Sequence, residues 1–77
     1  MNFNEYKTSD LTEAVVLKYH CHKLVFVDKA EYRAQFCFER QQDTDDVLNS
    51  YRERVLMVEP YAFSLCQKEV KDRLYNN

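Results

Sequence analysis

The sequence lacks glycine and tryptophan altogether and contains one proline, Pro60. Without glycine the chain cannot build the glycine-rich loops that cradle phosphates, so P-loop and dinucleotide-binding motifs are excluded. Turns that need a positive φ must use other residues, which favours type I turns and turns built on Asp or Asn. No apolar run approaches the roughly 18–20 residues of a membrane span, and residues 1–5 lack the basic start and apolar centre of a signal peptide. We therefore expect a cytoplasmic protein without membrane contact.

The charge and size of the chain narrow the function classes further. Its 77 residues carry 11 Lys and Arg against 13 Asp and Glu, a net charge of −2 that provides no long-range attraction to nucleic acid. An apolar content of 45% is too high for a disordered segment and predicts one small domain over residues 1–77. A domain this small rarely encloses a ligand cleft. We expect no enzymatic activity, no cofactor and no small-molecule substrate.

Three widely spaced cysteines, Cys21, Cys37 and Cys66, are an odd number in a chain with no secretory signal, which favours free thiols. We expect all three to be small buried apolar residues. The run from His20 through Cys21 to His22 contains metal-ligating types, but zinc needs four ligands, and Cys37 and Cys66 have no second ligand nearby. A helix end with a favourably placed imidazole is the preferred interpretation. The sequence leaves open whether these residues ever hold a metal.

Capping residues and an apolar period of 3.6 predict a first helix over about 10–20. A side-chain oxygen of Ser9 or Asp10 can accept a hydrogen bond from a backbone N–H of the first turn. The apolar positions cover one arc of this helix, and Glu13 and Val16 lie opposite. We therefore predict a half-buried helix.

Two apolar runs that follow have the length and composition of strands. Residues 23–27 are rich in β-branched and aromatic residues and predict a strand covered on both faces. In residues 32–39 apolar and polar positions alternate, which places Phe36 and Phe38 on the buried face. The short polar turn between the runs predicts an antiparallel hairpin.

The second half of the chain predicts a helix, a strand and a helix. Acidic residues at 43–46 suit the positive end of a helix over about 44–53. Residues 55–58 are an apolar run of strand length. Pro60 then fits the first position of a last helix.

The expected order of elements is thus helix, strand, strand, helix, strand, helix. A right-handed crossover from the second strand to the third would place the third strand beside the first. The sheet is then three-stranded and antiparallel in the order 2-1-3, with helices packed on it, which is an α+β fold with two layers.

In this predicted sheet the second strand, ending in Phe36-Cys37-Phe38, lies at an edge. Its unpaired backbone groups could pair with a second copy across a two-fold axis and form a homodimer. Arg33 and Glu39 could instead act as charged residues that block such pairing. Both the monomer and the dimer therefore stand as hypotheses.

The last helix carries a basic face, to which Lys68, Lys71 and Tyr75 contribute. Two ammonium groups and an aromatic ring could hold phosphates and stack a base. Arg52 and Arg54, just before the third predicted strand, could widen this face. A simpler explanation is that Lys and Arg near a helix C-terminus complement the helix dipole and keep the surface soluble.

Short motifs spread over nearly the whole chain also carry a family resemblance. They are Tyr6-Lys7-Thr8-Ser9-Asp10-Leu11, Ala14, Leu17, His22-Lys23-Leu24, Phe36, Phe38, Tyr51, Val58 with Pro60, and Lys71-Asp72-Arg73-Leu74-Tyr75. In these features the chain resembles an uncharacterised family of short bacterial and phage proteins, a domain of unknown function. The family pattern has a glycine where this chain has Cys21, and a side chain at that position argues against a left-handed helix cap. The resemblance implies a cytoplasmic accessory domain, often on mobile elements, without catalytic residues.

These observations favour a non-enzymatic protein-interaction module, either as a monomer or as a homodimer. The alternative is a nucleic-acid-binding protein that uses Lys68, Lys71 and Tyr75, with Arg52 and Arg54.

Overall fold

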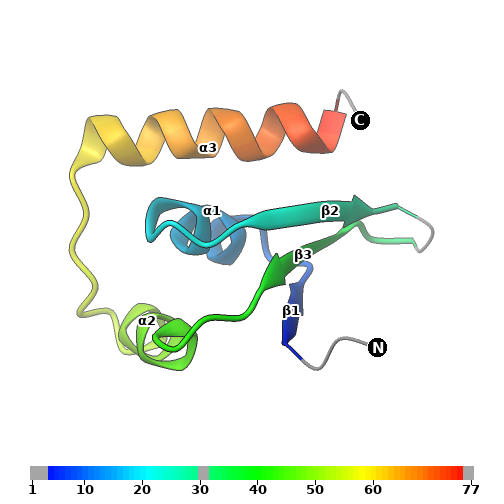
Figure 1. Ribbon diagram of the computed structural model, residues 1–77. Coiled ribbons are helices and arrows are strands. Elements are labelled where there is room, and N and C mark those ends of the chain that lie inside the picture. The colour runs from blue at the N-terminus through cyan, green and yellow to red at the C-terminus, as the bar shows by residue number, and fades with distance from the viewer. Residues whose placement is uncertain (1–3, 30–31, 76–77) are drawn as a thin grey trace.

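The computed structural model describes residues 4–29 and 32–75. The elements in chain order are β1 (Glu5–Thr8), α1 (Leu11–Tyr19), β2 (Leu24–Asp28), β3 (Gln35–Glu39), α2 (Thr44–Arg52) and α3 (Pro60–Tyr75). β1 and β2 both pair antiparallel with β3, so the sheet has the order β1-β3-β2. α1 packs against the sheet and lies between α3 and α2 (Figure 1).

α1 is the centre of the core and is more deeply buried than the half-buried helix predicted. The buried apolar residues are Ala14, Val15, Val16 and Leu17 of α1, with Leu24, Val27, Phe36, Phe38, Val47, Leu48 and Val70 from the elements around it. Val16 and Glu13, both predicted on the exposed side, are buried. The reason is that α2 and α3 pack on the flanks of α1 that the sheet leaves open, so the helix is covered on nearly all sides.

The predicted order of elements is wrong because the chain begins with a strand. β1 forms through its pairing with β3, in which Tyr6 lies opposite Phe38 and Thr8 opposite Phe36. Two of its four residues are charged, so the local pattern of apolar residues does not predict a strand. The hairpin of β2 and β3 and all three predicted helices are confirmed, each within a few residues of the predicted ends.

The predicted sheet order 2-1-3 is also wrong, because β3, the second of the predicted strands, is central. Both edges of β3 are paired, one with β1 and one with β2. A homodimer formed through a free edge at Phe36-Cys37-Phe38 is therefore excluded. β2 is covered on one face only, since Val25 and Phe26 are partly exposed, whereas the sequence predicted cover on both faces.

The third predicted strand, residues 55–58, lies outside the sheet. It belongs to the extended connection that leads from α2 to α3 (Figure 1). β1 occupies the edge of β3 opposite β2, so the centre of the sheet offers no position for a further strand. Residues 55–58 thus have the composition of a strand but pair with no other strand.

α1 and α2 each end in a residue with a positive φ, although the chain has no glycine. Cys21 has φ 66°, and the N–H groups of Cys21 and His22 donate to the carbonyls of Lys18 and Leu17, both at 3.0 Å. This is a Schellman cap, so the expectation that the side chain of Cys21 argues against a left-handed cap is wrong. Arg54, with φ 64°, closes α2 in the same way.

Candidate interaction surface

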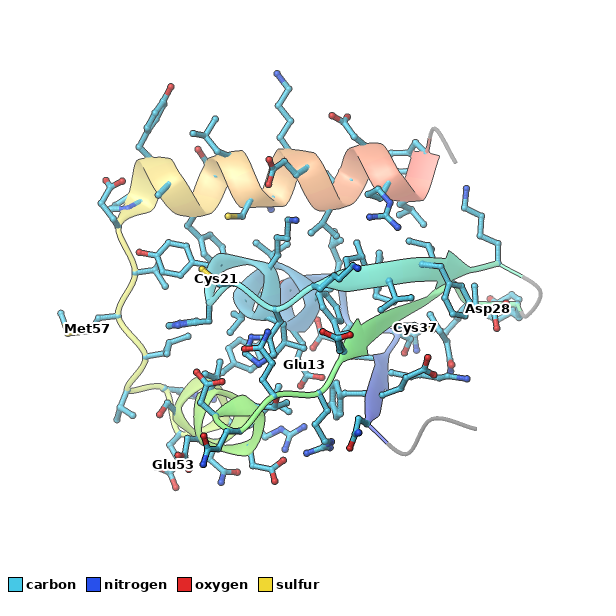
Figure 2. All side chains as sticks on the ribbon, viewed as in Figure 1. Glu13, Cys21, Asp28, Cys37, Glu53 and Met57 are labelled. Atoms are coloured by element: carbon cyan, nitrogen blue, oxygen red, sulfur yellow. The ribbon has the colours of Figure 1, made fainter. Side chains whose placement is uncertain are left out.

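The segment between α2 and α3, residues 54–59, is termed the linker. Its side chains alternate as in a strand: Leu56 and Val58 are half-buried, while Val55 is 63% and Met57 88% exposed. In Figure 2 the side chain of Met57 points away from the rest of the molecule. Exposed apolar side chains gathered in one segment are typical of a surface that contacts another molecule.

The two ends of the linker are fixed by helix caps. At its start Arg54 forms the left-handed cap of α2, and the N–H of Val55 donates to the Ser50 carbonyl at 3.1 Å. At its end the Glu59 carboxylate caps α3 by accepting hydrogen bonds from the backbone N–H of Ala62 at 2.8 Å and of Tyr61 at 3.1 Å. These hydrogen bonds to the charged form lower the pKa of Glu59 below its usual range. The linker is thus held extended between two anchored points.

The middle of the linker has backbone donors without partners. The N–H of Glu59 donates to the Tyr19 hydroxyl at 2.9 Å. The N–H groups of Leu56, Met57 and Val58 form no hydrogen bond within the part of the chain that the structure describes. An extended segment with unpaired backbone groups has the pairing capacity of an edge strand.

A cleft of about 290 Å³ lies on the inner side of the linker. Leu56 and Val58 form part of its wall, together with Val16, Tyr51 and Phe63 from the three helices. Its lining is mostly apolar, and it is open to solvent. The linker therefore has apolar side chains on both of its faces.

The basic face predicted on α3 is present only in part. Lys68, Lys71 and Tyr75 are exposed on α3, but Glu69 and Asp72 are exposed on the same helix and offset the positive charge. Arg52 and Arg54 lie at the end of α2, and α1 separates α2 from α3 (Figure 1). The structure therefore brings together the three α3 residues and leaves the two arginines elsewhere.

Arg52 belongs to a hydrogen-bonded cluster that joins three elements. Its guanidinium donates to the Glu13 carboxylate of α1 at 3.3 Å and to the Tyr6 hydroxyl of β1 at 3.1 Å. The Tyr6 hydroxyl in turn donates to Glu13 at 2.7 Å. The Glu13 carboxylate raises the pKa of Arg52, and burial raises the pKa of Tyr6, with a further contribution from Glu13. The Arg52 side chain thus links α2 to β1 and α1 through these hydrogen bonds.

The run from His20 to His22 forms the end of α1, as the preferred interpretation holds. The His22 side chain is 1% exposed, and its ring nitrogens contact the His20 carbonyl at 3.2 Å and the Thr44 hydroxyl at 2.8 Å. A carbonyl only accepts, so Nδ1 carries a proton and, in the neutral ring, Nε2 accepts from Thr44. In residues 4–29 and 32–75 no three His, Cys, Asp or Glu side chains are grouped as metal ligands.

The three cysteines differ in environment, so the prediction that all are buried is wrong in part. Cys37 is fully buried, Cys66 is half-buried and Cys21 is exposed at the helix cap. Burial raises the pKa of the Cys37 and Cys66 thiols.

Sequence reasoning identified the apolar run at 55–58 but not its exposure. No local signal reports this exposure, because it depends on which strand edges the assembled sheet leaves free. Helix capping by Glu59 could have been inferred, because a carboxylate next to a proline at the first helical position suits a helix start.

Comparison with known proteins places the chain in a family. Among the described residues, no helix has the length and apolar character needed to cross a membrane. No curated protein and no solved structure shows significant similarity to the chain. One family model, described as a domain of unknown function, matches residues 3–76. This match confirms the resemblance to an uncharacterised family, while a bacterial or phage origin stays a prediction. The chain therefore belongs to the family of the domain of unknown function DUF5659.

Proposed function

We propose that the protein is a non-enzymatic protein-interaction module and that its linker binds an extended segment of a partner protein. The observation that carries this proposal is the unpaired backbone of Leu56, Met57 and Val58 in a segment of strand-like composition. In strand addition, backbone hydrogen bonds provide affinity and alternate side chains provide specificity. The linker offers both kinds of contact.

The exposed side chains of the linker supply a hydrophobic contribution to binding. Val55 and Met57 are 63% and 88% exposed. Fully burying a side chain of this kind stabilises a complex by about 1.5–3 kcal/mol. Successive N–H groups of an extended segment point to opposite edges, so a partner strand beside the linker could accept from the N–H groups of Leu56 and Val58 while covering part of this surface.

Site-specific photo-crosslinking in cells that naturally produce the protein tests this proposal. A photoreactive amino acid placed at Met57 should give a discrete covalent adduct with a partner. The matched control places the same amino acid at Asn49, which is exposed on α2, and should give none. An adduct pattern that is the same at both positions, or no adduct at Met57 and Val55, would contradict the proposal.

Hydrogen exchange then distinguishes strand addition from other modes of binding. With a crosslinked partner isolated and mixed with the protein, we expect slower amide exchange at Leu56, Met57 or Val58. Protection confined to residues outside the linker would rule out strand addition.

The alternative function, nucleic-acid binding through Lys68, Lys71 and Tyr75, stays a prediction. Two lysines that neutralise two phosphates give a slope of about −2 in a plot of log affinity against log salt. Fluorescence anisotropy with labelled single- and double-stranded oligonucleotides across a salt series tests it. Absence of binding at low salt would eliminate this alternative.

A further inference from the structure

α3 has a stripe of exposed side chains on the side opposite its packed face. The stripe consists of Tyr61, Leu65, Lys68, Asp72 and Tyr75. Successive members are four, three, four and three residues apart, which is the spacing of a seam between two paired helices. The packed face, which includes Cys66, Val70 and Leu74, lies on the other side of the helix, against α1. α3 is the outermost element on its side of the molecule (Figure 1).

The residues of the stripe are arranged so that two copies of it, placed antiparallel, bring complementary side chains to the same level. Val70 lies midway in the chain between Lys68 and Asp72, and also midway between Leu65 and Tyr75. When two copies of α3 lie antiparallel with a two-fold axis at the level of Val70, Lys68 of each copy is level with Asp72 of the other. Leu65 of each copy is likewise level with Tyr75 of the other. The central pairs are of opposite charge, and the outer pairs are apolar.

We propose that α3 mediates an antiparallel homodimer in which this stripe of one copy packs on the same stripe of a second copy. An isologous interface of this kind closes after two subunits. The inference is independent of the linker, because the stripe and the linker are different segments. It also differs from the homodimer excluded above, which required a free edge on β3.

The charges of the stripe are available for contact with a second copy. In the part of the chain that the structure describes, neither Lys68 nor Asp72 takes part in an ion pair. Tyr75 is 73% and Leu65 47% exposed. Pairing these groups across the axis would bury apolar surface and bring each ammonium near a carboxylate, which sets the register as well as the affinity.

Other parts of the surface fit a second copy less well. The start of β2 is in contact with α3, since the Arg73 guanidinium donates to the carbonyls of Leu24 at 3.1 Å and Val25 at 3.2 Å. The linker, paired antiparallel with itself about a two-fold axis, would leave Val55 and Met57 on one exposed face. The α3 stripe has matched charges as well as apolar side chains.

Sedimentation equilibrium from micromolar to millimolar protein tests the proposal. We expect the average mass to rise from 9.3 kDa toward twice that value. Lys68→Asp and Asp72→Lys should each weaken the dimer by about tenfold or more, because each brings four like charges to the axis. The double variant Lys68→Asp with Asp72→Lys should restore dimer affinity to within about threefold of the unchanged protein, since it only exchanges the two charges.

The control is Glu53→Lys, which changes an exposed charge just after the end of α2, far from α3 (Figure 2), and should leave dimer affinity unchanged. Circular dichroism of each variant checks that the fold is intact. A chain that stays monomeric at millimolar concentration, single variants that dimerise normally, or a double variant as weak as the single ones would overturn the proposal. None of these results depends on a linker adduct, so the proposed function and the dimer can fail separately.

Discussion

At the scale of single residues, the absence of glycine has a measurable consequence. Cys21 and Arg54 hold the left-handed positions that end α1 and α2. For a residue with a Cβ this conformation costs roughly 1–2 kcal/mol. Small domains have a total stability of about 5–15 kcal/mol, so two such positions are a substantial fraction of it. The caps persist because each satisfies two carbonyls at the end of its helix.

Cys21→Gly should stabilise the protein by about 0.5–1 kcal/mol. Glycine removes the steric cost of the left-handed conformation, and the greater freedom of the unfolded chain offsets part of the gain. Urea denaturation measures the change. Cys21→Ala is the control, because it keeps the Cβ and removes only an exposed thiol, and it should show little gain. Equal stabilisation by Gly and Ala would show that the backbone is not the cause.

The three thiols should react with iodoacetamide in the order of their exposure. Cys21 is exposed and should be modified first, Cys66 more slowly, and Cys37 only when the protein unfolds. The thiolate is the reactive form, and burial raises the pKa of Cys66 and Cys37 and so reduces it further. Mass spectrometry of digested samples gives the rate at each site. In denaturant all three rates should converge, and early labelling of Cys37 would contradict its burial.

At the scale of elements, the helices were predicted well because their signals are local. Asp10 does accept hydrogen bonds from the N–H groups of Thr12 and Glu13, as its position before an apolar helix implied. The strands were harder. β1 depends on a partner far away in the chain, since Glu5 pairs with Glu39, 34 residues later. Residues 55–58 look like a strand yet have no strand beside them. Strand formation depends on available edges, which no local pattern reports.

The Glu59 cap at the start of α3 predicts that the stability of the protein depends on pH. Hydrogen bonds from the Ala62 and Tyr61 N–H groups lower the pKa of Glu59 in the folded state. A carboxyl with a lowered folded pKa contributes stability above its unfolded pKa and loses that contribution as pH falls through the folded pKa. Unfolding free energies of the unchanged protein and Glu59→Gln should therefore differ near neutral pH and converge at acidic pH. Denaturant titrations from pH 7 down to pH 3 measure this difference.

The matched control for the pH series is Glu53→Gln, which removes an exposed carboxylate from the end of α2. Its difference from the unchanged protein should vary less with pH. If the Glu59→Gln difference instead grew on acidification, the Glu59 carboxylate would not be acting as the cap of α3.

At the scale of the whole molecule, sequence reasoning identified the three helices and one hairpin, but the predicted order of elements and the predicted order of strands in the sheet are wrong. The candidate site shows the same division. Exposure of Lys68, Lys71 and Tyr75 follows from helical periodicity, whereas the separation of Arg52 from them depends on where α2 packs. Burial of Glu13 could not be anticipated either, because its partners Tyr6 and Arg52 come from two other elements. Local periodicity predicts which residues share one face of a helix or strand. Which element covers that face depends on how the elements pack in the complete fold.

The contact between α3 and β2 occupies backbone carbonyls of β2 that could otherwise pair with another chain. The two terminal nitrogens of the Arg73 guanidinium, Nη1 and Nη2, donate to the carbonyls of Leu24 and Val25 in β2, next to a bulge at Val25. Hydrogen bonds from a charged donor are worth about 1.5–3 kcal/mol, and partial exposure reduces this, so Arg73→Met should destabilise the protein by about 1–2 kcal/mol. The uncovered edge should also promote aggregation, which light scattering during thermal unfolding would detect. Lys71→Met, a similar change at an exposed position of α3, is the control. If both variants aggregated alike, lost charge rather than the open β2 edge would be responsible.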